Sequence, residues 1–228
     1  MVRFYTGVLT PAEYGTGDLL ITAVSMLMPF VSLGISDGVF RFLPEYPGAN
    51  KSVFSIGIYT VTAGAVFSAA LLPILRSAEV FRGYLPLLAF MTITACYHSA
   101  CAQYIRAVGN TLLFAKQGLF NTVLVVGLNI LFLTVLRLGV TGYVMSIGSA
   151  DFFCSVYLVV KQRLWRCLTS RPNRRLIRKM LLYSIPLIPT TVFWWITGVS
   201  DRYMISVMLG NGACNLGKLF CRFFGACR

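Results

Sequence analysis

The stretch "VFSIGIYTVTAGAVFSAALLPIL", residues 53–75, contains no charged side chain. An α-helix rises 1.5 Å per residue, and about 20 apolar residues are enough to cross the ~30 Å hydrocarbon core of a bilayer. The apolar and polar residues do not alternate with the period of two that is typical of an outer-membrane β-barrel. The stretch therefore predicts a membrane-spanning α-helix.

Five further apolar runs are long enough to cross a bilayer and are interrupted by few polar residues. They are residues 19–43, 85–105, 117–136, 140–160 and 180–209. The whole chain of 228 residues is 57% hydrophobic and 12% charged, whereas a soluble domain has about 25% charged residues. The sequence predicts an all-α polytopic membrane protein with about six transmembrane helices.

The charge of the chain is strongly basic, with 20 Lys and Arg against 7 Asp and Glu. These cations cluster between apolar runs instead of covering a polar surface, so we expect no nucleic-acid partner. Residues 161–179, "KQRLWRCLTSRPNRRLIRK", hold eight basic and no acidic residues. The positive-inside rule predicts a cytoplasmic loop here, and a patch for lipid head groups or regulation is the alternative. This orientation places residues 1–18 outside, so we expect one more span before Met1.

The sequence offers little for metal, redox or covalent chemistry. The seven cysteines contain no CxxC pair and no Cys/His cluster with zinc-ligand spacing. We find no nucleophile motif and no phosphate-binding loop. We therefore expect no disulfide framework, no metal, no cofactor and no enzyme activity.

Three stretches together resemble one family of transporters. They are "GVLTPAEYGTGDLL" (residues 7–20), "YIRAVGN" (104–110) and "YSIPLIPTTVFWWITGVSDRYMISVMLG" (183–210). Their order and spacing resemble the polysaccharide-biosynthesis branch of the multidrug/oligosaccharidyl-lipid/polysaccharide exporter superfamily, the oligosaccharide (O-antigen) flippases. The resemblance implies two helical bundles around a central cavity, in a chain of twelve or fourteen helices.

On this resemblance the chain offers the equivalents of helices two to seven and is a truncated copy. Residues 1–160 would form a partial N-terminal bundle without its first helix, and residues 161–179 the basic cytoplasmic loop. Residues 180–212 would be the first helix of the C-terminal bundle. Residues 213–228 depart from the family and suggest a tail translated out of frame.

The function that the resemblance implies is translocation of a polyprenyl-pyrophosphate-linked oligosaccharide across the inner (plasma) membrane. The partners would be this lipid-linked oligosaccharide, membrane lipids and a coupling ion, either a proton or sodium. The product would be an O-antigen or capsule-like polysaccharide. The alternatives are a drug or small-molecule exporter of the same superfamily, a membrane-embedded enzyme of polysaccharide assembly, and a non-functional fragment.

One acidic residue lies deep in a predicted span. Asp151 is near the middle of residues 140–160, where a carboxylate costs at least ~2.5 kcal/mol on insertion scales. It is a candidate for ion coupling, or else a neutral group hydrogen-bonded to a neighbouring helix. His98 is also deep in its span and becomes a coupling candidate if it approaches Asp151. Asn121 and Asn129 lie on one broad side of their helix, which indicates hydrogen bonds between helices.

The other candidate residues lie near the ends of spans and are candidates for substrate binding. Arg41 follows Asp37 by four residues, a spacing that permits a pair along a helix. Arg41 either snorkels to the cytoplasmic interface or offers paired N–H donors to a pyrophosphate. Asp201 and Arg202 close the last span, and we place them at its outer interface.

The first predicted span also contains Pro29, Gly34 and Gly38. These residues make the helix bendable, which a transporter with alternating access would use. The glycines equally suit close packing against another helix.

Overall fold

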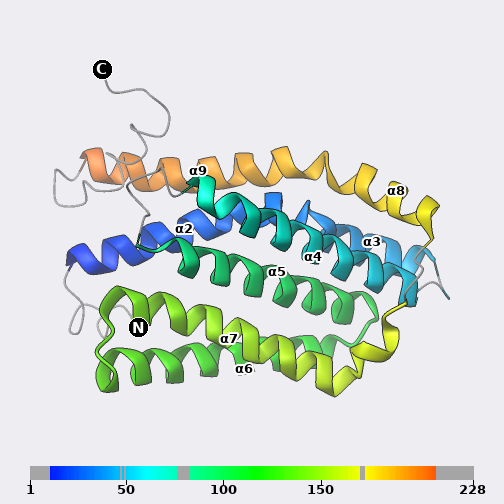
Figure 1. Ribbon diagram of the computed structural model, residues 1–228, viewed down its shortest axis with the longest axis horizontal. Coiled ribbons are helices and arrows are strands. Elements are labelled where there is room, and N and C mark those ends of the chain that lie inside the picture. Colours follow the sequence, from blue (N-terminus) through cyan, green and yellow to red (C-terminus); the bar gives the residue numbers. More distant parts are fainter. Residues whose placement is uncertain (1–10, 47, 49, 76–82, 170–172, 209–228) are drawn as a thin grey trace.

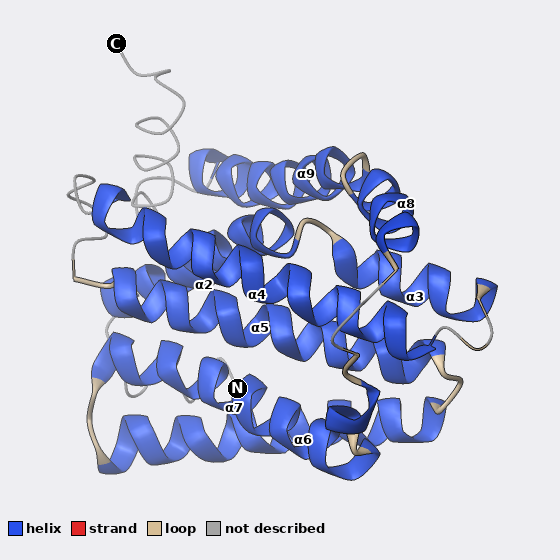
Figure 2. Cartoon of the chain, turned by 45° about the vertical axis from the view of Figure 1, so that its right-hand side comes forward, coloured by secondary structure: helices blue, strands red, loops and turns tan. Residues whose placement is uncertain are grey.

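The computed structural model describes residues 11–46, 48, 50–75, 83–169 and 173–208. All regular structure in these residues is helical, and the long helices lie side by side along one direction (Figures 1 and 2). The elements are α2 (Pro11–Ser32), α3 (Ile35–Glu45), α4 (Asn50–Leu75), α5 (Leu85–Ala107), α6 (Thr111–Ile130), the π-helical turn η2 (Leu131–Val135), α7 (Gly139–Gln162), the 3₁₀ turn η3 (Leu164–Cys167), α8 (Arg174–Ser184) and α9 (Leu187–Met208).

Six segments are long and apolar enough to cross a membrane, which confirms the prediction of a polytopic all-α protein. They are Gly15–Ser32, Asn50–Ala70, Leu85–Ala107, Thr111–Val135, Gly139–Gln162 and Arg174–Ser200. The fourth begins six residues before the predicted run 117–136, because Asn110 caps this helix. The Asn110 side chain accepts a hydrogen bond from the backbone N–H of Leu113 at 3.2 Å.

The first predicted span, residues 19–43, is divided into two helices. The chain adopts positive φ at Leu33 (50°) and Gly34 (63°), so α2 ends at Ser32 and α3 begins at Ile35. Glycine takes up this left-handed conformation without steric cost, which explains its place at the break. The backbone N–H of Gly34 reaches back to the carbonyl of Pro29 at 3.2 Å and so satisfies one carbonyl of the last turn.

The last predicted span is also divided, and its first half starts inside the basic segment. Asn173 caps α8 by accepting a hydrogen bond from the backbone N–H of Arg175 at 3.0 Å. The helix α8 ends at Ser184, and α9 begins at Leu187, after Pro186, which lacks a backbone N–H. Residues 174–179 of the segment that we expected to be a loop therefore belong to an amphipathic helix.

The two helix breaks lie against each other. A Cβ atom built on Gly34 would lie 3.1 Å from the backbone carbonyl oxygen of Ser184. A Cβ atom built on Gly38 would lie 2.7 Å from the side-chain Oγ of Ser184. The side chain of Ser184 is fully buried. The two glycines, four residues apart, thus let the end of α8 approach α3 at backbone distance.

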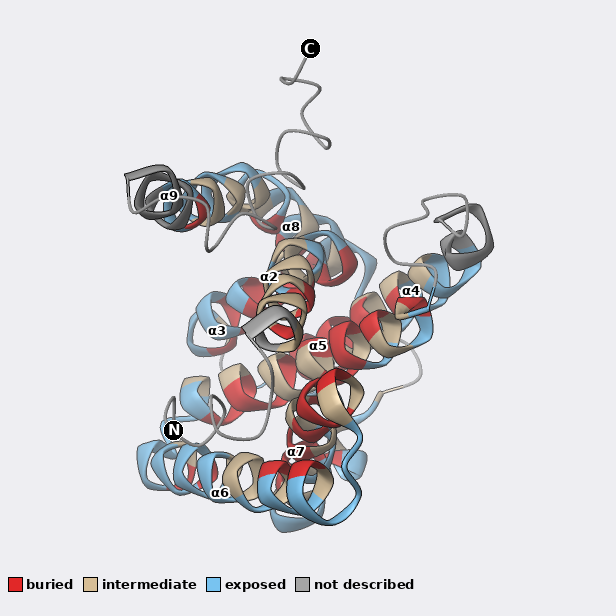
Figure 3. Ribbon diagram, turned by 90° about the vertical axis from the view of Figure 1, so that its left-hand side faces the viewer, coloured by how far each residue is buried: buried red, intermediate tan, exposed pale blue. Residues whose placement is uncertain are grey.

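The helix α5 is the centre of the packing. It contacts α2, α3, α4, α6 and α7, and buried residues gather on α5 and on the faces turned toward it (Figure 3). Around it, the crossing of α2 and α4 is especially close, because a Cβ atom built on Gly64 would lie 1.8 Å from the carbonyl oxygen of Val31. Such close approach at small residues is the usual source of helix association in a membrane.

The helix α9 lies at the periphery, where it contacts α2 and α8 (Figure 3). The indole Nε1 of Trp195 donates a hydrogen bond to the backbone carbonyl of Thr22 on α2 at 3.0 Å. The neighbouring Trp194 is 75% exposed and Phe193 is also exposed. The described part of the chain leaves this aromatic surface uncovered.

Candidate functional site

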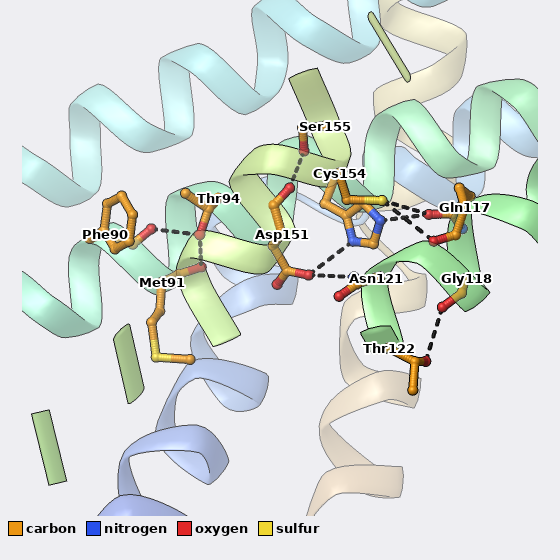
Figure 4. A network of polar contacts seen from close by, with 11 residues as sticks. Phe90, Met91, Thr94, Gln117, Gly118, Asn121, Thr122, Asp151, Cys154 and Ser155 are labelled. Carbon is orange, nitrogen blue, oxygen red and sulfur yellow. Dashed lines mark hydrogen bonds and ion pairs between the residues drawn. The ribbon is translucent and has the colours of Figure 1, made fainter. Parts of the chain in front are cut away.

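A network of polar side chains joins α5, α6 and α7 (Figure 4). The carboxylate oxygen Oδ1 of Asp151 on α7 lies 3.2 Å from Nδ1 of His98 on α5. The same oxygen accepts a hydrogen bond of 2.8 Å from the side-chain amide of Asn121 on α6. The Asp151 and His98 side chains are only 16% and 18% exposed. Polar groups from α5 and α6 therefore meet on one carboxylate of α7.

A second part of the network lies on the other side of the imidazole ring. Nε2 of His98 is 2.8 Å from the amide oxygen Oε1 of Gln117. The thiol of Cys154 donates to the same oxygen at 3.3 Å, and it also approaches the Gln117 backbone carbonyl at 3.6 Å. Sequence reasoning missed both residues. Gln117 lies one helical turn before Asn121, and Cys154 lies three residues after Asp151, so their spacing was the available signal.

The hydrogen-bond pattern determines where protons sit in this network. An amide oxygen only accepts hydrogen bonds, so Nε2 of His98 carries a hydrogen that it donates to Gln117. The contact between Nδ1 of His98 and Oδ1 of Asp151 then needs one further hydrogen, held by either partner. The pair is thus an imidazolium with a carboxylate or two neutral groups, and its net charge is zero in both cases. Loss of that proton would leave one negative charge inside the bundle.

The prediction that both asparagines of α6 bond to another helix is confirmed. Asn121 reaches Asp151, and the side-chain oxygen of Asn129 accepts a hydrogen bond of 2.7 Å from the hydroxyl of Ser146 on α7. The amide nitrogen of Asn129 is buried without a hydrogen-bond partner in the described part of the chain.

A second candidate site is the exposed face of α3. The guanidinium carbon of Arg41 lies 4.9 Å from the ring centroid of Tyr183 on α8. Asp37, one turn before Arg41, is also exposed, yet the two side chains form no salt bridge within the described residues. The spacing of Asp37 and Arg41 permitted a pair, but in the structure Arg41 instead contacts an aromatic ring.

Two more cations near this face contact aromatic rings in the same way. The guanidinium carbon of Arg106 on α5 lies 4.6 Å from the ring centroid of Phe40 and 5.8 Å from that of Phe114. Lys179 on α8 lies 5.6 Å from the ring centroid of Tyr46 and donates a hydrogen bond to its hydroxyl at 3.1 Å. We call Arg41, Arg106 and Lys179 with these rings the cationic face. No salt bridge between these cations and a described carboxylate forms, so their charges are open to an external anion.

The remaining two candidate residues for substrate binding have side chains that the structure does not describe. The backbone of α9 is helical at Asp201 and Arg202, but their side chains lie outside the described residues, so their role in substrate binding stays a prediction. Where side chains are described, no three His, Cys, Asp or Glu residues gather as a metal site would require. Cys96, Cys101, Cys154 and Cys167 are thiols, and the first three are buried.

Comparison with known proteins assigns the chain to a family. A family model described as polysaccharide biosynthesis protein matches residues 2–220, which is nearly the whole chain. No curated protein and no solved structure gives a significant match. With its six membrane-capable helices, the chain is a multi-pass membrane protein, and it belongs to the polysaccharide biosynthesis protein family.

Proposed function

We propose that the chain acts in a flippase that moves a polyprenyl-pyrophosphate-linked oligosaccharide from the inner to the outer leaflet of the inner membrane. The family match and the resemblance to O-antigen flippases support the substrate class. The observation that carries the proposal is the cationic face, where three cations contact aromatic rings in place of carboxylates. The product would enter an O-antigen or capsule-like polysaccharide.

The cationic face suits a pyrophosphate for physical reasons. A guanidinium presents N–H donors in a planar fork that matches two phosphate oxygens. An aromatic ring over the guanidinium group of Arg41 or Arg106 restricts the rotamers of that arginine and does not compete for its N–H donors as a carboxylate would. Transport needs the anion to be bound and then released, and a site without a competing carboxylate allows both. No bond is made or broken in this step.

We further infer that the network of His98 and Asp151 couples transport to protons. The pair shares one hydrogen, and its loss would leave a net negative charge between three helices, which the low-dielectric interior of a membrane penalises. The bundle would therefore relax differently in the two protonation states. The geometry favours a proton over sodium, because Asn121 and His98 turn nitrogen atoms toward the carboxylate, whereas sodium requires converging oxygen ligands.

The test is complementation of a bacterial strain that lacks its O-antigen flippase. The chain would be expressed alone and also as a chimera that replaces the corresponding helices of the strain's own flippase. We expect the chimera to restore surface O-antigen and a chimera with Arg41→Ala and Arg106→Ala to fail at equal expression. Restoration by the double variant would contradict the role of the cationic face. Drug resistance without O-antigen would favour the exporter of small molecules.

A further inference from the structure

The outer face of α8 forms a groove that the proposed function does not use. The groove has a volume of about 350 Å³, and its walls are Arg174, Ile177, Arg178, Leu181, Leu182 and Ile185. These residues recur every three or four positions and so share one side of the helix. The opposite side, with Leu176, Met180 and Ser184, is buried against the bundle. The groove therefore lies on the side of α8 turned away from these three residues, and its inner edge, Ile177 and Leu181, also packs against the core.

The two ends of the groove differ in chemistry. Arg174 and Arg178 lie one turn apart at its beginning, and Leu182 and Ile185 lie toward its end, beside α9. From Arg174 to Ile185 the helix rises about 16 Å at 1.5 Å per residue. Leu182 is 72% exposed and Ile185 is 51% exposed. One ligand would thus meet two positive charges at one end and a hydrocarbon surface at the other.

The positive charge at the beginning of the groove has no local counterpart. Residues 152–200 contain no Asp or Glu. In the described part of the chain, neither Arg174 nor Arg178 forms a salt bridge. The two arginines at this end of the groove are therefore free to bind an anion that is not part of the chain.

We propose that the groove binds an anionic phospholipid of the surrounding bilayer. The phosphate of the head group lies between the guanidinium groups of Arg174 and Arg178, which donate charge-assisted hydrogen bonds to its oxygens. An acyl chain lies along Ile177, Leu181, Leu182 and Ile185. The position fits a bilayer ligand, because Arg174–Ser200 is long and apolar enough to span a membrane. A water-soluble phosphate would use only the first end, so the apolar end selects a lipid.

This lipid is distinct from the transported substrate and does not depend on the proposed transport. The cationic face of α3, α5 and α8 and the groove lie on different sides of α8. Lys179 and Tyr183, which are four residues apart, contact Tyr46 and Arg41, and neither of them lines the groove. The bound lipid would fix the height of α8 in the bilayer.

Binding can be measured by native mass spectrometry of the purified chain released from nanodiscs. The probes are phosphatidylglycerol, phosphatidylcholine, undecaprenyl phosphate and inorganic phosphate. We expect retained phosphatidylglycerol, and we expect the double variant Arg174→Gln/Arg178→Gln to weaken its retention about tenfold. The matched control, Arg166→Gln/Arg175→Gln, removes the same charge from the same basic segment outside the groove and should weaken retention less than about twofold.

A second variant tests the apolar end without removing charge. Leu182→Ser should reduce retention of phosphatidylglycerol while the chain elutes unchanged, since this side chain is exposed and contributes little to folding. Equal losses from the two arginine doubles would overturn the proposal, because diffuse positive charge would then explain binding. Retention of phosphatidylcholine equal to that of phosphatidylglycerol would also overturn it. Binding of undecaprenyl phosphate or inorganic phosphate without phosphatidylglycerol would assign the groove to another ligand.

Discussion

His98 on α5 and Asp151 on α7 meet inside the bundle, with 3.2 Å between Nδ1 and Oδ1, and Asn121 on α6 donates to the same carboxylate oxygen. A carboxylate at this depth is costly unless its oxygens are hydrogen-bonded. These contacts therefore offset the free-energy cost of burying the carboxylate. They also make the packing of α5, α6 and α7 depend on the proton that His98 and Asp151 share.

Replacement of Asp151 should separate its structural role from its role in coupling. Asp151→Asn keeps the shape and the acceptor for Asn121 but cannot exchange a proton at this position. We expect the chimera with this variant to fold and to lose the dependence of O-antigen export on the proton gradient. Asp151→Leu should destabilise the fold by about 1–3 kcal/mol, because His98 and Asn121 lose their partner. Thermal unfolding in detergent and export with and without a protonophore would measure the two effects.

The control for this series is Thr122→Ala on α6. Within the described residues the hydroxyl of Thr122 donates to the backbone carbonyl of Gly118 on its own helix and to no other helix, so its removal should change neither unfolding nor coupling. Gradient-dependent export by Asp151→Asn at the wild-type level would rule out Asp151 as the coupling group.

Gly64 should tolerate no side chain at the crossing of α2 and α4. A Cβ atom there would lie 1.8 Å from the backbone carbonyl oxygen of Val31, so Gly64→Ala must push the two helices apart. We expect a loss of about 1–3 kcal/mol in the free energy of unfolding or a loss of folded protein. Gly127→Ala on α6 is the matched control, because its Cβ would meet nothing within 4 Å. Equal melting temperatures of the two variants would show that the crossing is looser than the structure indicates.

Arg41 should bind the substrate through its geometry as well as its charge. Arg41→Lys keeps the charge but loses the planar fork and its stacking on Tyr183, so we expect roughly tenfold weaker binding of a polyprenyl-pyrophosphate sugar. Arg41→Ala should weaken binding further. Lys116→Ala serves as control, because it removes a cation from α6 that, among the described residues, has no cation–π contact with a ring of the cationic face. Binding to purified chimera in nanodiscs would measure these effects, and equal affinities of the Lys variant and the wild type would contradict the bidentate role.

The two adjacent tryptophans of α9 should behave differently. Trp195→Phe removes the hydrogen bond from Nε1 to the carbonyl of Thr22, and we expect α9 to dock on α2 less stably by about 0.5–1.5 kcal/mol. Trp194→Phe should have little effect, because this side chain is 75% exposed. Hydrogen exchange of the amides in α9 would report the difference. Similar exchange in both variants would mean that this bond does not hold α9.

The sequence was sufficient for the spans because run length and apolar composition are local properties. The sequence was less informative about whether each span is one continuous helix. Pro29, Gly34 and Pro186 indicate bends, yet whether a helix bends or breaks depends on what packs against it. Six spans were therefore predicted correctly, while the division into α2 and α3 and into α8 and α9 appeared only in the structure.

Prediction of the candidate site from the sequence was limited in the same way, because contacts between helices are not local properties. The depth of Asp151 and His98 was visible from their positions in the spans, but their contact depends on how α5 and α7 pack. Gln117 and Cys154 looked like ordinary members of apolar runs, and only the contacts to His98 and to each other distinguish them. Aromatic partners of Arg41 and Arg106 were equally invisible, because they come from neighbouring helices.

The contact of Gly34 and Gly38 with Ser184 has a mechanical consequence. It places the break between α2 and α3 against the end of α8, just before the break that leads to α9. Straightening either helix pair at its break would displace atoms of the other, since Gly34 meets the Ser184 backbone and Gly38 meets the short Ser184 side chain. The first and the last spans of this chain thus meet at their breaks, and we expect a rotation that starts in either of them to displace the other.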